Sequence, residues 1–190
     1  MPRRFSKSLG KRTHSNLNKG ISTLDENEGI HFLESLEADP FILILDQIQD
    51  PRNLGACLRS ADGAGVDMVV LPADRTVALT DVVRHVAAGA AESLVLMRVR
   101  NLARVMREFR DQGLSLLGTS DHAKKTIYEV SMRGPFGLVV GAEEMGMRRL
   151  TSDNCNHLAK IPMCGKVDCL NVSVATGVAL FEAVRQRNLV

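Results

Sequence analysis

The sequence predicts an α/β domain built on a mostly parallel sheet with helices on both faces. Short continuous apolar runs, typical of strands that are covered on both faces, alternate along the chain with segments of helical periodicity. Such alternation favours parallel pairing of the strands. The chain has 190 residues, of which 45% are hydrophobic, so it can bury one sizeable core.

The predicted elements follow one another from Pro40 onward. The first strand is the apolar run FILIL at residues 41–45, and the second is MVVL at residues 68–71, which Pro72 stops. Further strands are expected at residues 94–96, 114–119, 136–140 and 157–161. Helices are expected at residues 53–64, 77–87, 102–109 and 172–187.

Ligands of such sheets bind beyond the carboxyl ends of the strands. The segments that follow predicted strands are therefore the places to look for a site. Four of them are rich in glycine, proline, asparagine or charge: residues 46–59, 119–122, 141–147 and 161–171.

Charge is distributed unevenly before Pro40. Residues 1–20 carry six basic and no acidic side chains, and residues 21–40 carry six acidic and no basic ones. We expect residues 1–39 to form a flexible extension and residues 40–190 to form the folded domain. The basic block is either an arm that touches phosphate groups or a plain tail.

Several classes of protein are disfavoured by the composition. The sequence has no run of about 18 apolar residues, which a membrane span would need, and no apolar stretch behind its basic N-terminus, as a secretory signal would have. Its four cysteines form no CxxC pair, which disfavours a zinc site and favours a reducing cytoplasm. No P-loop motif is present, which disfavours ATP or GTP hydrolysis.

The first candidate motif is DPRNLGACLRSA at residues 50–61, which opens a predicted helix. Asn53 is suited to cap that helix. Arg59 lies at the border of the apolar face, where it is either a solvated side chain or a fork that grips phosphate.

The second candidate motif is GAEEMGMRR at residues 141–149, directly after a predicted strand. Gly141 lets the backbone turn sharply or approach a ligand, and the two glutamates, of which Glu143 is the first, are suited to orient a polar group. The alternative is an ordinary turn whose acidic residues lie near a helix start.

The third candidate motif is IPMCGKVDCLNVSVATG at residues 161–177, where a loop runs into the last predicted helix. Asn171 is placed to cap that helix, and the loop offers backbone groups that can hydrogen-bond a planar heterocycle. The helix is rich in small residues, so it either packs very closely or helps to build a site.

In this order and spacing, the three motifs resemble those of the SpoU (TrmH) class of RNA ribose 2′-O-methyltransferases, within the SPOUT superfamily. The resemblance spans residues 41–187, and the stretches NLGACLRSADGAGV and LNVSVATG are most similar to members that modify a guanosine of bacterial 23S rRNA. The matching residues are Asn53, Gly55, Arg59 and Ser60 in the first motif, Gly141, Glu143 and Gly146 in the second, and Pro162, Leu170, Asn171, Val172, Ser173 and Ala175 in the third.

The resemblance implies a C-terminal trefoil knot that holds S-adenosylmethionine, and a homodimer in which the last helix packs closely. It implies RNA as the substrate and no metal. The cofactor-binding residues that it implies are Thr119, Gly141, Ile161, Met163, Leu170 and Ser173.

The resemblance also implies that a methyl group is transferred to a ribose 2′-hydroxyl, and it gives the catalytic residues as Arg59, Asn53, Glu143 and Asn171. The hydroxyl must lose its proton as it attacks. The family assigns that proton to Arg59. Because a guanidinium is nearly always protonated in proteins, the alternative is that Arg59 holds the RNA phosphate and the 2′-oxygen.

Two features depart from the relatives. Many of them have serine where this chain has Cys169, and they carry a small RNA-binding domain where this sequence has about forty residues of other composition. Three alternatives stay open: a tRNA ribose methyltransferase, an RNA-binding protein of the same fold without turnover, and a generic α/β nucleotide-binding domain.

Overall fold

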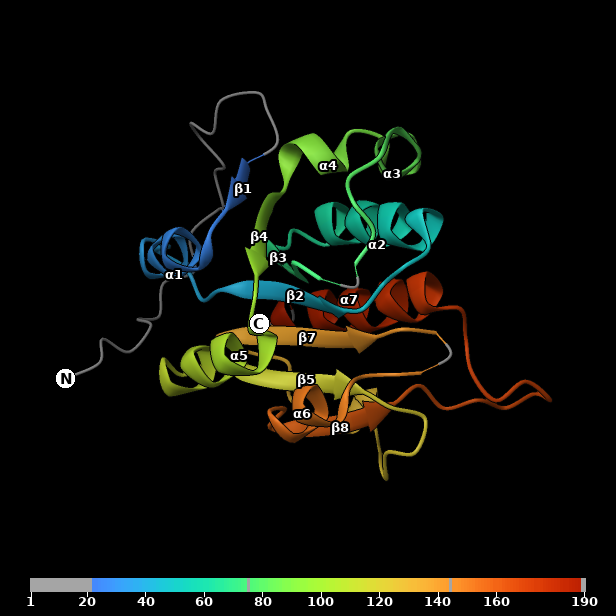
Figure 1. Cartoon of the computed structure of the whole chain (residues 1–190). Helices are drawn as coiled ribbons and strands as arrows, with labels where there is room; N and C mark the ends of the chain where they lie inside the picture. The colour runs from blue at the N-terminus through green and yellow to red at the C-terminus, as the bar shows by residue number, and fades with distance from the viewer. Residues whose placement is uncertain (1–21, 75, 144, 189–190) are drawn as a thin grey trace.

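The computed structural model describes residues 22–74, 76–143 and 145–188. Within these residues, one sheet has the strand order β1-β4-β3-β2-β7-β5-β8-β6 (Figure 1). Every pair of neighbouring strands runs parallel, which confirms the predicted α/β class. The strands are β1 (Ser22–Leu24), β2 (Phe41–Asp46), β3 (Met68–Pro72), β4 (Val95–Val99), β5 (Ser115–Thr119), β6 (Lys125–Thr126), β7 (Phe136–Gly141) and β8 (His157–Lys160).

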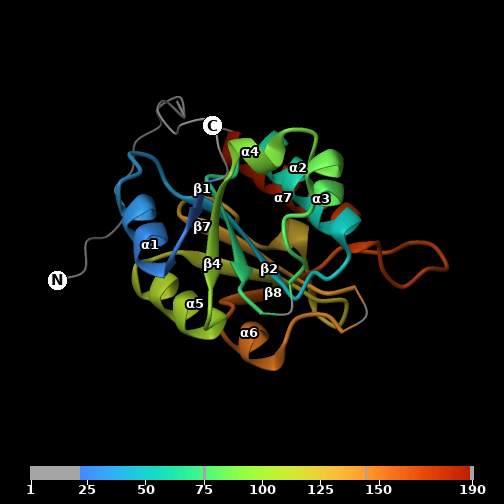
Figure 2. The same cartoon turned by 45° about the horizontal axis from the view of Figure 1, so that its top comes forward.

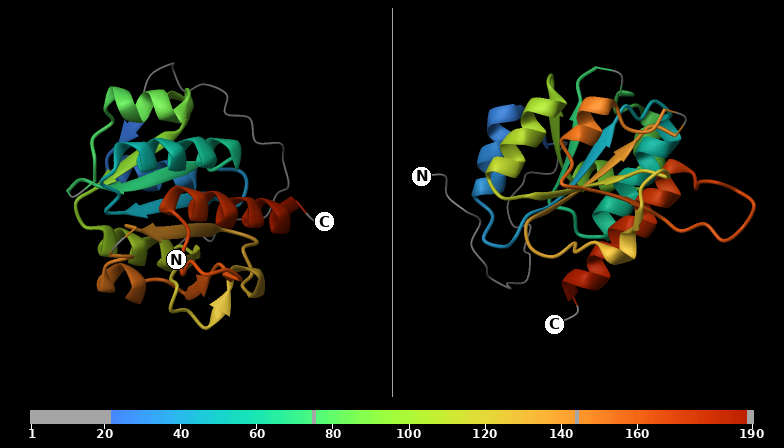
Figure 3. Two further views of the ribbon diagram at one scale, coloured as in Figure 1. Left: turned by 90° about the vertical axis from the view of Figure 1, so that its right-hand side faces the viewer. Right: turned by 90° about the horizontal axis from the view of Figure 1, so that it is seen from below.

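Helices cover both faces of the sheet (Figure 2). One face carries α2 (Pro51–Gly63), α3 (Asp81–Ala87), α4 (Ala90–Ser93) and α7 (Val172–Asn188). The other face carries α1 (Glu26–Glu34), α5 (Leu102–Asp111) and α6 (Arg149–Asp153), as the right-hand view of Figure 3 shows. A 3₁₀ turn, Ile127–Glu129, follows β6. Among the described residues, none of the helices has the length and apolar character that crossing a membrane requires.

Strand β2 shows how one strand supplies two cores. Phe41, Leu43 and Leu45 belong to the apolar cluster under α2, α3 and α7, whereas Ile42 and Ile44 belong to the cluster under α1 and α5. All five side chains are buried. Each contributes roughly 1.5–3 kcal/mol by leaving water. Strand β2 pairs with β7 in the middle of the sheet, so their carboxyl ends lie side by side.

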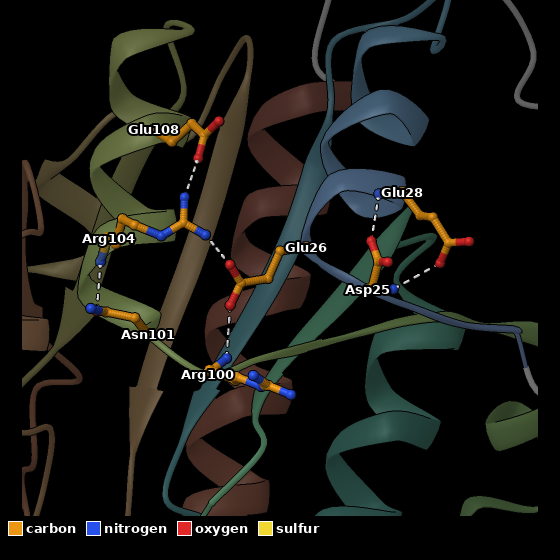
Figure 4. Close-up of polar contacts among 7 residues, drawn as sticks. All are labelled: Asp25, Glu26, Glu28, Arg100, Asn101, Arg104 and Glu108. Atoms are coloured by element: carbon orange, nitrogen blue, oxygen red, sulfur yellow. Dashed lines mark hydrogen bonds and ion pairs between the residues drawn. The ribbon is translucent and has the colours of Figure 1, made fainter.

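The folded part begins before Pro40, so the prediction that residues 1–39 form a flexible extension is wrong for residues 22–36. Strand β1 pairs with β4, and Leu33 of α1 is fully buried. Helix α1 opens with a capping box, in which Asp25 and Glu28 each accept the other's backbone N–H (Figure 4). The basic block at residues 1–20 lies outside the described residues.

Glu26, one of the six acidic residues at positions 21–40, connects α1 to α5 and to the chain before it. Glu26 accepts the backbone N–H of Arg100 at 2.8 Å and pairs with the guanidinium of Arg104 in α5 (Figure 4). Arg104 also reaches Glu108, one turn further along α5, at 3.2 Å. The acidic residues therefore serve as caps and ion-pair partners of a folded segment.

The other predicted elements are present, with shifted ends. Helix α2 begins two residues before the predicted start, at Pro51. The helix predicted from residue 77 begins at Asp81, because Thr80 is its N-cap and accepts the N–H of Val83. The short elements α4, α6, β6 and the 3₁₀ turn were not predicted, since they are too short to show a period.

The end of α7 is tied to the chain that connects β6 and β7. Gln186 accepts the backbone N–H of Met132 and donates to the carbonyl oxygen of Val130. Arg187 donates to the carbonyl oxygen of Gly134. The trefoil knot stays a prediction.

Candidate functional site

A cavity of about 350 Å³ opens at the carboxyl ends of β5, β7 and β8. Most of its lining residues lie within the stretches 119–122, 140–147, 159–163 and 168–175, and Ser152 adds to them. These stretches overlap three of the four segments that follow predicted strands, and the fourth segment, residues 46–59, supplies none of the lining. Polar groups and apolar side chains share the wall, and the volume lies in the range of small-molecule sites.

One wall is the segment Gly141–Met147, which we term the Glu143 loop. A Cβ atom on Gly141 would lie 2.2 Å from the carbonyl carbon of Gly146 and from the nitrogen of Met147, so no larger residue fits there. Gly146 has a φ of 63°, in the left-handed region that favours glycine. Ala142 and Gly146 exchange two backbone hydrogen bonds, at 3.1 and 2.8 Å. The loop therefore folds back over the end of β7.

Asn53 is not the cap of α2, which corrects the sequence interpretation. Asp50 is the cap, since its carboxylate accepts the N–H of Arg52 at 2.7 Å, and Pro51 occupies the first turn. Proline behind an aspartate cap is a favoured start for a helix. The side chain of Asn53 is thus available for contacts with another segment.

Asn53, Glu143 and Asn171 form a closed triangle of hydrogen bonds, which we term the Asn-Glu-Asn triangle. Asn53 Nδ2 donates to Glu143 Oε2 at 3.1 Å. Asn171 Nδ2 donates to Glu143 Oε1 at 3.0 Å and to Asn53 Oδ1 at 3.1 Å. Each of the three sequence motifs supplies one member, so the triangle joins all three motifs beside the cavity.

The orientation of Asn171 follows from its place at the start of α7. Its Oδ1 accepts the backbone N–H of Ser173 at 3.0 Å and the hydroxyl of Ser173 at 2.6 Å. This capping contact turns the amide oxygen toward the helix. The Nδ2 group is left to face Glu143 and Asn53.

The small residues of the first and third motifs serve helix packing. A Cβ atom on Gly55 would lie 2.7 Å from the carbonyl oxygen of Val83, so this glycine lets α2 and α3 approach closely. A Cβ atom on Gly177 would lie 3.5 Å from Ser60 Oγ, where α7 crosses α2. Gly55 is therefore explained by packing of helices rather than by contact with a ligand.

An unpredicted ion pair lies behind the Glu143 loop. Asp46, the last residue of β2, is fully buried, and its carboxylate accepts from three groups of Arg148. The distances are 3.0 Å from the backbone nitrogen, 2.8 Å from Nε and 2.7 Å from Nη2. An acidic residue that closes a wholly apolar strand is the one signal in the sequence that pointed to this pair.

The cysteines fall into two groups. Burial raises the pKa of Cys57 to about 11 and that of Cys155 to about 12. Cys164 and Cys169 are exposed, and Cys169 lines the cavity. The residues that the structure describes hold no group of three or more His, Cys, Asp or Glu side chains suited to a metal ion.

The predicted cofactor residues gather at one place. All but one of them line the cavity: Thr119, Gly141, Ile161, Met163 and Leu170. Ser173 is the exception and contacts Asn171 instead. Their role in binding a cofactor stays a prediction.

The predicted catalytic residues gather less completely. Glu143 lines the cavity, and Asn53 and Asn171 contact Glu143. Arg59 is exposed on α2 and is not among the residues that line the cavity. Its six-residue separation from Asn53 turns it to another side of the helix.

Relatives in sequence are rRNA-modifying enzymes. The chain is 53% identical over 164 residues to the 23S rRNA (guanosine-2′-O-)-methyltransferase RlmB of Yersinia pestis. The match covers 86% of this chain and 66% of that protein. The chain thus spans about two thirds of the length of this curated relative.

Solved structures of similar fold are methyltransferases and a tRNA modifying enzyme. The SpoU methyltransferase AviRb from Streptomyces viridochromogenes, in complex with the cofactor AdoMet, has a TM-score of 0.73 at 26% identity, over 80% of this chain and 62% of that one. The TrmH/SpoU tRNA modifying enzyme of A. aeolicus has a TM-score of 0.72 at 29% identity, over 78% of this chain and 75% of that one.

The family model of the SpoU rRNA Methylase family matches residues 40–181. This range contains every residue of the cavity lining and of the Asn-Glu-Asn triangle. By its sequence and by its fold, the chain belongs to the SpoU rRNA Methylase family.

Proposed function

We propose that this protein transfers a methyl group from S-adenosylmethionine to a ribose 2′-hydroxyl of RNA, on a guanosine of 23S rRNA. The observation that carries the proposal is the Asn-Glu-Asn triangle, which joins the three motifs beside a cavity of small-molecule size. The names of the RlmB relatives support the RNA, and the AdoMet complex of AviRb supports the cofactor.

The residues around the cavity fit this cofactor. Its volume of about 350 Å³ suits a ligand of nucleoside size. Ile161 and Leu170 supply apolar surface for a planar heterocycle, and the glycine at position 141 lets the loop backbone come close. When bound there, the cofactor supplies an electrophilic methyl group on a sulfonium centre.

The protein's own groups would orient the ribose and hold the charge that develops on its oxygen. In the triangle, the Glu143 carboxylate is held by two amide donors, so its position is fixed before substrate arrives. Asn53 and Asn171 would shape the place of the ribose. Arg59 would hold the RNA phosphate and the 2′-oxygen as negative charge develops.

A homodimer is part of the proposal. Helix α7 exposes about half of Val174 and of Phe181, each at 51%, on a helix rich in small residues. Two such helices can pack closely against each other, as apolar surfaces of this kind do at interfaces. A cytoplasmic location is also part of the proposal, and the rRNA named for the RlmB relatives supports it.

Transfer of labelled methyl groups tests the proposed function. Purified protein with labelled S-adenosylmethionine is expected to methylate rRNA and to leave tRNA unlabelled, because its identity to the rRNA enzyme, at 53%, exceeds that to the tRNA enzyme, at 29%. Label in tRNA alone would favour a tRNA ribose methyltransferase. Cofactor binding without transfer to either RNA would favour an RNA-binding protein, and absence of cofactor binding would defeat the proposal.

Reactivity of the thiols gives a second expectation. At pH 8, iodoacetamide should modify Cys164 and Cys169 quickly, while Cys57 and Cys155 stay unmodified because burial shields them and keeps them protonated. S-adenosylmethionine should protect Cys169, which lines the cavity, and leave Cys164 reactive. Mass spectrometry of labelled peptides measures both effects. Equal labelling of Cys169 with and without cofactor would place the ligand elsewhere.

A further inference from the structure

We propose that Asp46 and Arg148 are positioning residues, which hold the Glu143 loop in the shape that the cavity and the triangle require. The proposal rests on the proposed function, since it assigns the pair to the same site. Neither residue is in any of the matched motif positions, and Asp46 cannot touch a ligand because it is fully buried.

The register of the sheet places Asp46 beneath the start of the loop. Asp46 is paired with Gly141 at the last position of the β2–β7 ladder. Its carboxylate then accepts from Arg148, directly after the end of the loop, through the backbone nitrogen and two guanidinium nitrogens. A fork of this kind fixes direction as well as distance, which a single point charge does not. Both ends of the loop are therefore attached to the same strand end.

Between these attachments, hydrogen bonds join Ala142 to Gly146. These two bonds hold the two sides of the loop together, and the backbone at Gly146 and Met147 covers Gly141. Glu143 lies between Ala142 and Gly146, so the position of its carboxylate depends on the position of this segment. Releasing Arg148 would free one end and let Glu143 move relative to its two amide donors.

Asp46 also stands at the head of the first motif. The chain leaves β2 at Asp46, passes through Gln47 with a φ of 66°, and enters α2 at Pro51, which places Asn53 in the first turn. The buried carboxylate of Asp46 thus lies at the paired ends of β2 and β7, and the segments that carry Asn53 and Glu143 follow these two strand ends. Asn53 and Glu143, which share a hydrogen bond of 3.1 Å, are therefore both positioned by segments that Asp46 holds.

The alternative is that the pair only stabilises the fold. A buried ion pair is a weak source of stability, because taking both charges out of water offsets most of their attraction. The chain offers a matched control outside the cavity lining. Glu182 of α7 is 7% exposed and is held by Arg185 through Nε and Nη2, each at 2.8 Å, but it does not line the cavity.

The test compares Arg148→Lys and Asp46→Asn with Glu182→Gln. Arg148→Lys keeps the charge and the backbone hydrogen bond but loses the fork, so it should fold even if Asp46→Asn does not. We expect Arg148→Lys to raise the Kd for S-adenosylmethionine, measured by calorimetry, about tenfold, and to lower kcat as well. Glu182→Gln should lower the melting temperature about as much as Arg148→Lys does. It should leave the Kd for S-adenosylmethionine and kcat within about twofold of the values for the unaltered protein.

Hydrogen exchange provides a readout that needs no cofactor. In Arg148→Lys, amides at residues 142–148 should exchange faster than in the unaltered protein, while those of β2 and β7 do not change. Unaltered exchange in that segment would overturn the proposal. This result does not depend on the proposed function, because the exchange is measured without S-adenosylmethionine. Faster exchange with unaltered Kd and kcat would overturn the proposal as well.

Discussion

Replacement of Arg59 by alanine is expected to abolish methylation of RNA and to leave binding of S-adenosylmethionine nearly intact. Arg59 is exposed on α2 and lies outside the lining of the cavity, so its removal leaves the cofactor's surroundings unchanged. If it holds the phosphate and the developing charge on the 2′-oxygen, its loss lowers the rate by about a hundredfold or more. Calorimetry measures the binding, and transfer of label to rRNA measures the rate.

A matched control for this variant is Arg107→Ala. Arg107 is an exposed arginine of α5, on the opposite face of the sheet, so its removal changes net charge by the same amount away from the site. Methylation by Arg107→Ala should stay near that of the unaltered protein. If Arg59→Ala loses affinity for the cofactor, or if it methylates at the normal rate, the proposed role of Arg59 is wrong.

Replacement of Gly141 by alanine is expected to remove cofactor binding. The added Cβ would lie 2.2 Å from backbone atoms of Gly146 and Met147, and backbone, unlike a flexible side chain, cannot turn aside. The Glu143 loop must therefore shift, and the wall of the cavity shifts with it. The affinity for S-adenosylmethionine should fall by more than about a hundredfold, which corresponds to a loss of about 2.8 kcal/mol of binding free energy.

Gly165→Ala is the control for this change. Gly165 lies in the loop that leads to α7, and nothing stands within 4 Å of its added Cβ, so the same substitution is harmless there. Both variants are compared by calorimetry and by thermal unfolding. A Gly141→Ala protein that binds the cofactor as the unaltered protein does would show that the loop tolerates displacement.

The periodic parts of the fold are predictable because burial alone dictates them. FILIL and MVVL read as strands covered on both faces, and they are β2 and β3. The prediction of a flexible extension is wrong for residues 22–36, which contain β1 and α1. The capping box joins neighbouring residues, Asp25 and Glu28. The ion pair of Glu26, however, depends on Arg104 of α5, which lies 78 residues further along the chain.

The site was predictable only in part. Three of the four segments that the strand-end rule selects supply residues of the cavity lining, and the rule needs no knowledge of relatives. The partners within the site are a different matter. Asn53 reads as a cap because the sequence does not show that Asp50 already fills that role, and the contact of Asp46 with Arg148 spans 102 residues. Local pattern carries no information about pairs so distant.

The hydrogen bond between Asn171 and Asn53 joins residues that are 118 positions apart, and this separation has a consequence for biosynthesis. Contacts between distant parts of a chain form late in folding, because a long loop must close first. Asn171 is fixed by α7, which ends at Asn188. A nascent chain that still lacks its final helix therefore has most of its sheet but no working site. Binding of the proposed cofactor would therefore report that α7 has docked on the sheet.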